Sequence, residues 1–367
     1  MAEPSDANDA PAPPASAARE RASSYRFSSP ACALERHEMV SLYVSDVRRL
    51  CACTPPPPPH PAEALPAAAV RLLTWNLNLL LGADGEQDVA ASDVFALLES
   101  LDADVLVLQE VPVDKLNVLW AAWSDKLAAP MTRVRMLDAL LCGAGYSLHR
   151  TDADNPTLLA TRLQVVHTET FALDEEPTVT LNGGERWTEA RGALYAELRI
   201  PANGSTIAVY ATHLHHKDHD EVHGEGIRLR EARRILAHWR QRAPTSAAAA
   251  CWILADFNQP RRDDYSADEW RVVAEGLTSA HVAQPECDLV QQAMRAEGFV
   301  SSFEAAATNN FGGRPAPVMT HWTGTTVDFA YFHCVEGRTP TRITGAYVCY
   351  SDLSDHLPVV SDATVGP

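Results

Sequence analysis

The segment Ser354-Asp355-His356-Leu357-Pro358 sets an imidazole beside a carboxylate, directly after the apolar, strand-like run 345–350. The ordinary pKa of histidine lies near neutrality, so an adjacent acid can hold the ring in its charged form. An imidazolium in a fixed position can stabilise the negative charge that develops when a phosphate ester is attacked. Such chemistry requires further polar partners from elsewhere in the chain.

Upstream segments supply these partners, each at the end of an apolar run. Core packing does not call for a polar residue at every strand end, whereas a site does, because strand ends meet at one edge of a sheet. Alone, each residue has a structural explanation, such as a strand cap, an acid that starts a helix, a turn or a buried structural histidine. The residues that we expect to converge are Asn76, Glu110, His213, Asp256, Asn258, Asp328, Asp355 and His356.

The elements that must position these residues follow from hydrophobic periodicity. We predict strands at 70–77, 105–108, 158–161, 165–170, 193–200, 206–214, 251–255, 327–332, 346–350 and 358–361. We predict helices at 87–101, within 115–142, and at 225–241, 267–277 and 288–296. Many strands with interspersed helices predict the α/β class, as a sandwich of two packed mixed sheets with helices outside.

Composition separates a tail from a folded domain. Residues 1–68 are rich in alanine and proline and predict a disordered tail, in which 35–50 has the spacing of a short helix. The proline run 55–59 predicts a stiff linker, with docking to an SH3-type module as the alternative. We expect residues 69–367 to form the catalytic domain.

Charge and hydropathy narrow the class of protein. The 367 residues carry 30 basic and 48 acidic side chains; 6 and 8 of these lie in residues 1–68, which leaves 24 and 40 in the remainder. This acidic field opposes nonspecific attraction to nucleic acid but permits a divalent-metal site. The chain shows no apolar run of about 20 residues and no signal-peptide pattern, so we expect a soluble intracellular protein, cytoplasmic or nuclear.

Six motifs, in this order, resemble the signature of the endonuclease/exonuclease/phosphatase superfamily. The resemblance covers about residues 70–364 and implies the DNase I-like fold, a four-layer α/β/β/α sandwich. The motifs are Arg71-Leu-Leu-Thr-Trp75-Asn76, Asp104-Val-Leu-Val-Leu-Gln109-Glu110-Val111, Tyr210-Ala-Thr-His213-Leu214, Leu254-Ala-Asp256-Phe-Asn258, Thr326-Val-Asp328-Phe and Ser354-Asp355-His356-Leu-Pro358.

The resemblance implies a metal-assisted phosphoesterase. Glu110 would bind Mg²⁺, or alternatively Mn²⁺, with Asn76 beside it and Asp355 at a second metal position. Asp256 would align or deprotonate the attacking water. The remaining catalytic residues would be Asn258 on a phosphate oxygen or the water, His213 on the phosphate or the leaving group, His356 as the charge-stabilising imidazolium or the base, and Asp328 as the carboxylate that orients His356.

Two further segments contain candidate residues. Arg228 could reach a substrate phosphate, with a solvated helix face as the alternative, and Trp322 could stack on a base or cover a head group. The histidine-rich stretch 213–223 fits a solvated loop, with zinc binding as the alternative.

The best-supported function is therefore a Mg²⁺-dependent phosphoester hydrolase, which we expect to be a nuclease-like phosphodiesterase. Departures from the inositol-phosphatase and AP-endonuclease patterns leave the substrate open between nucleic acid and a phospholipid head group. A lipid or small-molecule phosphodiesterase of sphingomyelinase type is one alternative. A non-catalytic binding or scaffold protein on the same fold is the other.

Overall fold

The computed structural model describes residues 58, 68–80, 89–111, 124–152, 156–173, 178–180, 186–188, 190–215, 221–279, 288–314, 316–317, 319–321 and 324–366. Its strands are β1 (Ala68–Asn76), β2 (Val105–Gln109), β3 (Ser147–Arg150), β4 (Leu158–Thr161), β5 (Gln164–Ala172), β6 (Thr178–Thr180), β7 (Arg186–Thr188), β8 (Gly192–Arg199), β9 (Thr206–His213), β10 (Ala248–Asp256), β11 (Val300–Ser301), β12 (Thr308–Asn309), β13 (Asp328–Cys334), β14 (Thr341–Val348) and β15 (Val359–Val365).

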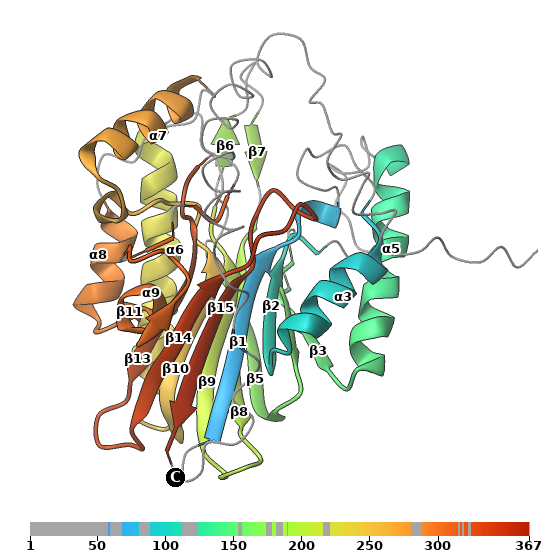
Figure 1. Cartoon of the computed structure of the whole chain (residues 1–367), viewed down its shortest axis with the longest axis vertical. Helices are drawn as coiled ribbons and strands as arrows, with labels where there is room; N and C mark the ends of the chain where they lie inside the picture. Colours follow the sequence, from blue (N-terminus) through green and yellow to red (C-terminus); the bar gives the residue numbers. More distant parts are fainter. Residues whose placement is uncertain are drawn as a thin grey trace, which may run out of the picture.

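The helices flank these strands (Figure 1). They are α3 (Ala91–Leu101), α5 (Ser124–Gly143), α6 (Glu221–Arg242), α7 (Ala267–Ser279), α8 (Leu289–Ala296) and α9 (Ser302–Ala305), with short 3₁₀ helices η2 (Asn78–Leu80) and η3 (Arg262–Asp264). None of the helices in the described ranges is long and apolar enough to cross a membrane.

The strands form two large mixed sheets and a small separate one. The first sheet has seven strands in the order β12-β14-β15-β1-β2-β4-β3, and the second has six in the order β11-β13-β10-β9-β8-β5. The remaining strands, β6 and β7, pair only with each other. Strands β2, β9 and β10 are buried at every position, because each has packed layers on both of its faces.

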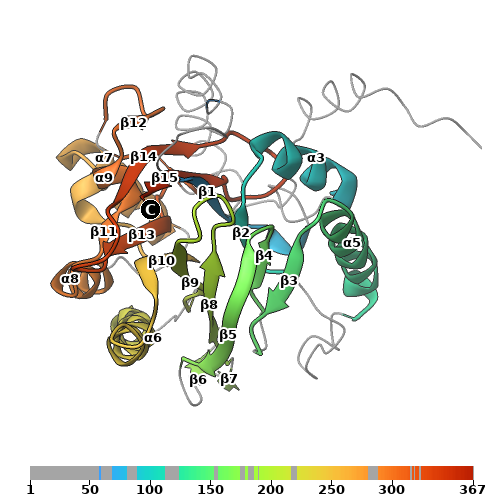
Figure 2. The same ribbon diagram turned by 90° about the horizontal axis from the view of Figure 1, so that it is seen from below.

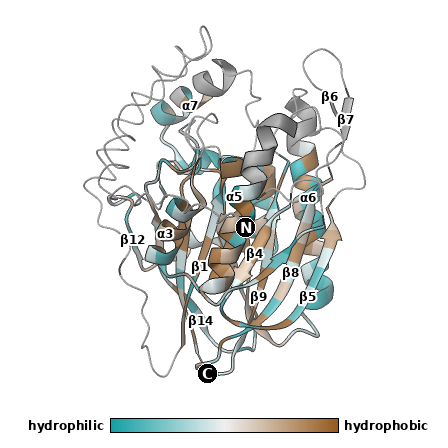
Figure 3. Cartoon of the chain, turned by 90° about the vertical axis from the view of Figure 1, so that its right-hand side faces the viewer, coloured by the Kyte–Doolittle hydropathy of each residue, from teal (hydrophilic) through white to brown (hydrophobic). Residues whose placement is uncertain are grey.

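The alternation along β1 contributes to two of the three large hydrophobic cores of the described residues. Val70 and Leu72 point into the core between the sheets, where Val209 also packs. Leu73 and Trp75 point the other way, into the core under α3 and α5. A third core lies between the six-stranded sheet and α6 and α8. Figure 2 shows the resulting order of layers, and Figure 3 shows apolar residues concentrated along the strands. The predicted four-layer sandwich is confirmed.

Strand directions bring the polar strand ends to one edge. Strands β1 and β2 are parallel and end together, with Asn76 opposite Gln109. In the second sheet, Asp256 at the end of β10 pairs with His213 of the parallel strand β9 and with Asp328 at the start of the antiparallel strand β13. Register alone therefore puts three of the predicted site residues side by side.

The predicted tail, its short helix and the docking function of the proline run lie outside the described residues, except for Pro58 and for Ala68, which is the first residue of β1. The carbonyl of Pro58 accepts a 2.7 Å hydrogen bond from Nη2 of Arg71. Arg71 is 2% exposed, and it also binds Asp362 through two bonds of 2.7 and 2.8 Å and the Leu101 carbonyl at 2.9 Å. The buried guanidinium thus has a carboxylate and carbonyls for its donors, as a buried charge requires.

Candidate active site

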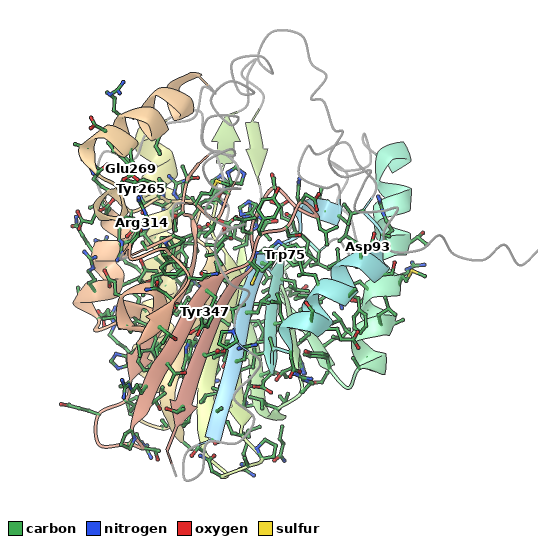
Figure 4. The ribbon with its side chains drawn as sticks, viewed as in Figure 1. Trp75, Asp93, Tyr265, Glu269, Arg314 and Tyr347 are labelled. Carbon is green, nitrogen blue, oxygen red and sulfur yellow. The ribbon has the colours of Figure 1, made fainter. Side chains whose placement is uncertain are left out.

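His356 and Asp328 form a buried pair at the shared edge of the two sheets. Nδ1 of His356 lies 2.9 Å from Oδ2 of Asp328, and the side chains are 7% and 0% exposed. The indole Nε1 of Trp75 donates to the His356 carbonyl at 2.9 Å, and Figure 4 labels Trp75 at the upper end of β1. The Oγ of Ser354 accepts from the His356 backbone N–H at 3.2 Å. These contacts fix both the ring and the backbone of the histidine.

The carboxylates around His356 determine its charge. Burial alone would lower the pKa of His356, but the negative charges of Asp328, Asp256 and Asp355 outweigh burial and raise this pKa well above the ordinary value. Burial is also the largest influence on Asp328 and raises its pKa, although the charge of His356 acts in the opposite direction. The ring is therefore an imidazolium near neutral pH, held by a carboxylate from another strand.

Asp256 is completely buried and lies at the centre of the arrangement. Its Oδ1 accepts from the backbone N–H of Asn258 at 2.8 Å, and its Oδ2 accepts from Nδ2 of Asn76 at 3.0 Å. Nε2 of His213 and Nε2 of His356 lie 3.4 and 3.7 Å from the same Oδ2. Burial would raise the pKa of Asp256, but His356, His213 and Asn76 lower it well below the ordinary value. Asp256 is therefore an ionised carboxylate with no proton to give.

Asn258 joins Asp256 to His213 through a tight turn. Its Nδ2 lies 2.9 Å from Nε2 of His213 and donates to the Leu214 carbonyl at 3.0 Å. Asn258 has a left-handed φ of 50°, which asparagine tolerates better than most residues. Glu110 is also left-handed, with φ 53°. A left-handed backbone conformation at a residue other than glycine costs about 1–3 kcal/mol, and it is typical of sites whose geometry is imposed by the surrounding structure.

Glu110 and Asp355 occupy the more open part of the site, and the buried Asn76 lies beside Glu110. Oε1 of Glu110 accepts from Nδ2 of Asn76 at 3.3 Å, and both Glu110 and Asp355 are half-buried. The hydroxyl of Ser354 donates to the Asn76 carbonyl at 2.7 Å and lies 3.4 Å from Oδ1 of Asp355. Burial would raise the pKa of Asp355, but a hydrogen bond from His321 and the charge of His356 lower it.

The donor set of this edge fits a hard divalent cation. Carboxylates are numerous at this edge, since the imidazolium of His356 faces Asp256, Asp328 and Asp355, and Glu110 lies beside Asn76. Half-buried carboxylate oxygens that can keep water or substrate oxygens beside them are what Mg²⁺ prefers. Excess negative charge near a phosphate would repel it unless a cation were bound, so the residues fit the metal that the sequence predicts.

Residues without a predicted role also shape the site. Oγ1 of Thr320 accepts from the backbone N–H groups of Val327 and Asp328, both at 3.0 Å, and the Thr320 carbonyl accepts from Leu357 at 2.7 Å. Thr320 thereby holds the segment before Asp328 against the segment after His356. In the interior, Nε2 of Gln109 donates to Oγ1 of Thr74 at 2.8 Å and lies 3.4 Å from the Thr212 carbonyl in the other sheet.

Two predicted substrate-binding residues remain, Arg228 and Trp322. Arg228 is 7% exposed, so the alternative of a solvated face is wrong; its Nη1 lies 3.3 Å from the carbonyl of His215, in the segment after His213. Its binding of substrate stays a prediction. Trp322 lies outside the described residues, as does 216–220 of the histidine-rich stretch.

Comparison with known proteins agrees with this geometry. Residues 73–356 match the model of the Endonuclease/Exonuclease/phosphatase family. An endonuclease/exonuclease/phosphatase from Beutenbergia cavernae DSM 12333 is 19% identical with a TM-score of 0.53, over 81% of this chain and 72% of that one. A second from Bacteroides vulgatus is 19% identical with a TM-score of 0.50, over 81% and 99%.

A human structure has the same fold at lower identity. The human Nocturnin catalytic domain with bound sulfate anion is 15% identical with a TM-score of 0.50, over 81% of this chain and 94% of that one. At these identities the solved structures share the fold, and they say nothing further about this chain. No curated protein matches the sequence.

Proposed function

Because the chain belongs to the Endonuclease/Exonuclease/phosphatase family, whose members are phosphoester hydrolases, we propose that it is a divalent-metal-dependent hydrolase of phosphodiesters. One observation carries the proposal: the ionised carboxylate of Asp256 lies 3.7 Å from Nε2 of His356, whose Nδ1 is held by Asp328. A carboxylate base and a cationic imidazole thus lie side by side. Their surroundings lower the pKa of the carboxyl group and raise the pKa of the imidazole.

Asp256 is the group that acts on water. Its carboxylate aligns a water molecule for attack on phosphorus and takes the proton that the water loses as the new O–P bond forms. Asn258 and Asn76 hold the carboxylate in place through its two oxygens. The bond from phosphorus to the leaving oxygen then breaks, with His213 donating a hydrogen bond to the phosphate or to the leaving group.

His356 stabilises charge as the reaction proceeds. Negative charge builds on the phosphate oxygens as water attacks, and a fixed imidazolium lowers the energy of that state without reorganisation. Asp328 keeps the ring oriented and charged. Its contact with Nδ1 of His356, on the side of the ring away from Asp256, suits a positioning role.

Glu110 and Asp355, with Asn76 beside them, would hold the cation. A bound Mg²⁺, or alternatively Mn²⁺, supplies charge neutralisation at a phosphate oxygen. The half-buried positions of Glu110 and Asp355 leave room for water and substrate oxygens in the remaining coordination sites.

The charge of the domain bears on the substrate. Residues 69–367 carry 24 of the 30 basic and 40 of the 48 acidic side chains, which disfavours a long polyanion and favours a lipid or small-molecule diester as the second candidate. Family membership favours the first candidate, a nuclease-like activity. Salt separates the two, because cleavage of nucleic acid through several phosphate contacts should weaken steeply with salt, whereas hydrolysis of a head group should require vesicles.

The experiment is an activity panel on the purified full chain with Mg²⁺ or Mn²⁺. Substrates are bis-p-nitrophenyl phosphate, p-nitrophenyl phosphate, DNA, RNA and sphingomyelin vesicles, with chelator and Asp256→Asn as controls. Hydrolysis of a diester that both controls abolish supports the proposal. If no substrate is cleaved and neither metal binds, the non-catalytic binding protein becomes the better explanation.

A further inference from the structure

A second imidazole lies at the open side of the site, on the turn that follows Thr320. The backbone N–H of His321 donates to the Thr325 carbonyl at 2.9 Å, and its carbonyl accepts from Gly324 at 3.0 Å. The backbone of His321 also forms an isolated β-bridge with His356. The position of His321 is therefore fixed relative to the last of the predicted catalytic residues.

The ring of His321 reaches the carboxylate that we place at the metal. Its Nε2 lies 3.5 Å from Oδ2 of Asp355, with side chains 24% and 28% exposed. Its ring centre is 4.4 Å from that of His356. One ligand atom from each of His321, Asp355 and His356 lies within 4.8 Å of the others, which is the spacing of a metal-binding group.

One member of this group, His356, already contacts two other carboxylates. His356 is held through Nδ1 by Asp328, and its Nε2 lies closer to Asp256, at 3.7 Å, than to Asp355, at 4.0 Å. His321 and Asp355 remain, and both are partly open to water that could complete a coordination shell.

We propose that His321 and Asp355 form a mixed nitrogen–oxygen position for a divalent cation, which gives the site a preference for Mn²⁺ over Mg²⁺. Imidazole is a good ligand for transition metals, whereas Mg²⁺ selects oxygen donors. The inference rests on the proposed function, because it assigns a further ligand to the same metal-dependent site. The competing explanation is a simple hydrogen bond from His321 that orients Asp355.

The direct test is pulsed electron paramagnetic resonance on the full chain loaded with Mn²⁺. A coordinated imidazole nitrogen modulates the echo of Mn²⁺, and we expect this ¹⁴N modulation in the unmodified protein. The variant His321→Asn keeps an amide that can donate to Asp355 but lacks the imidazole ligand, so the modulation should disappear. His333→Gln is the matched control, since His333 lies on β13 towards the end opposite Asp328, and it should keep the signal.

Affinity gives a second readout. The dissociation constant for Mn²⁺ should rise about tenfold or more in His321→Asn, while that for Mg²⁺ changes by less than about threefold. His321→Asp supplies an oxygen ligand in place of nitrogen; it should retain Mn²⁺ without ¹⁴N modulation and bind Mg²⁺ more tightly than His321→Asn does. It also serves if His321→Asn does not fold.

The outcomes separate this inference from the proposed function. If the unmodified protein binds no Mn²⁺ or Mg²⁺, the proposed metal-dependent function fails. If it binds Mn²⁺ without ¹⁴N modulation, or if the modulation survives in His321→Asn, only the role of His321 is overturned. Equal losses of affinity for both metals in His321→Asn would favour the orienting hydrogen bond and also overturn the proposal.

Discussion

Nδ2 of Asn76 on β1 donates a 3.0 Å hydrogen bond to Oδ2 of Asp256 on β10, so one side-chain contact joins the two sheets inside the proposed active site. The same nitrogen lies 3.3 Å from Oε1 of Glu110. The amide of Asn76 is neutral and donates hydrogen bonds, so it can lie between the carboxylates of Asp256 and Glu110 without adding a third negative charge.

We expect the variant Asn76→Asp to show the effect of losing this neutral donor. The change replaces the donor with a further carboxylate, so it should lower the stability of the metal-free protein by about 2–3 kcal/mol. Added Mg²⁺ should restore part of the loss by binding the new carboxylate. Thermal unfolding with chelator and with Mg²⁺ measures both effects. Asn78→Asp, two residues further on, is the control, and equal destabilisation there would contradict the explanation.

Asp256→Asn should abolish most activity while leaving the fold intact. The amide cannot accept a proton from water, so kcat should fall about 10²–10⁴-fold. Steady-state kinetics on the substrate identified by the panel measure the loss, and circular dichroism checks folding. Asp263→Asn is the matched control because Asp263 is 70% exposed and nearby in sequence. A variant with near-normal kcat would remove Asp256 from the mechanism.

Asp328→Asn should act through His356. Asp328 is one of the carboxylates that raise the pKa of His356, so the variant should titrate the ring at lower pH. Loss of the imidazolium should lower kcat about 10²–10⁴-fold at neutral pH, with KM little changed. In the pH–rate profile, the decline on the alkaline side should move to lower pH. An unmoved profile would argue that Asp328 only supports the fold.

The variant Glu110→Gln should weaken metal binding rather than slow the chemical step. The amide keeps the size of the side chain but loses the charge, so half-maximal activity should require about 10–100 times more Mg²⁺. Activity should partly recover at saturating metal. Titration of activity with Mg²⁺ gives the comparison, and Glu99→Gln on the exposed face of α3 should not differ from the unmodified protein. Full loss that no metal concentration reverses would point to a different role for Glu110.

A pH-dependent contribution to stability lies away from the site, between Glu269 and Arg314, which are labelled in Figure 4. Arg314 lies 2.6 Å from Glu269, and mainly through this contact the pKa of Glu269 falls from 4.5 to about 2. Because the pKa of Glu269 is lower in the folded state than in the unfolded state, its ionisation stabilises the folded protein at pH values above the unfolded-state pKa. The contribution should therefore be complete above pH 4.5 and disappear as pH falls towards 2.

Urea unfolding at several pH values tests this contribution. Glu269→Gln should cost about 1 kcal/mol or less at pH 7, because the pair is partly exposed. The difference from the unmodified protein should shrink below pH 4.5. Arg314→Gln should show the same window, and a double variant should add little to either single change. A difference that is constant across pH would assign the effect to packing.

Most of the fold could be predicted because its central strands carry an unmistakable pattern. Strands such as β2 and β10 are apolar at every core position, since helices cover one face and the second sheet covers the other. Edge strands lack this pattern. Ser147–Arg150 is short, polar and partly exposed, and it was not predicted. The strand predicted at 346–350 begins earlier, at Thr341, where a register shift near Gly345 interrupts its alternation.

The site could be predicted only as far as polar residues mark strand ends. Register explains why Asp256, Asp328 and His213 are neighbours. The left-handed backbone of Glu110 has no counterpart in its residue type, whereas asparagine at position 258 is a residue type that tolerates this conformation. Thr320 and His321 were not predicted as site residues, because their contacts with residues 355–357 depend on a turn that the sequence pattern does not specify.

The place of β15 in the seven-stranded sheet has a consequence for biosynthesis. His356 directly precedes β15, which lies between β14 and β1, so the ring reaches Asp328 and Asp256 only when this late strand has joined strands made long before it. Residues up to Val365 must therefore have left the ribosome before the proposed site can assemble. A nascent chain that already contains Asn76, Glu110 and Asp256 lacks this site until β15 is inserted.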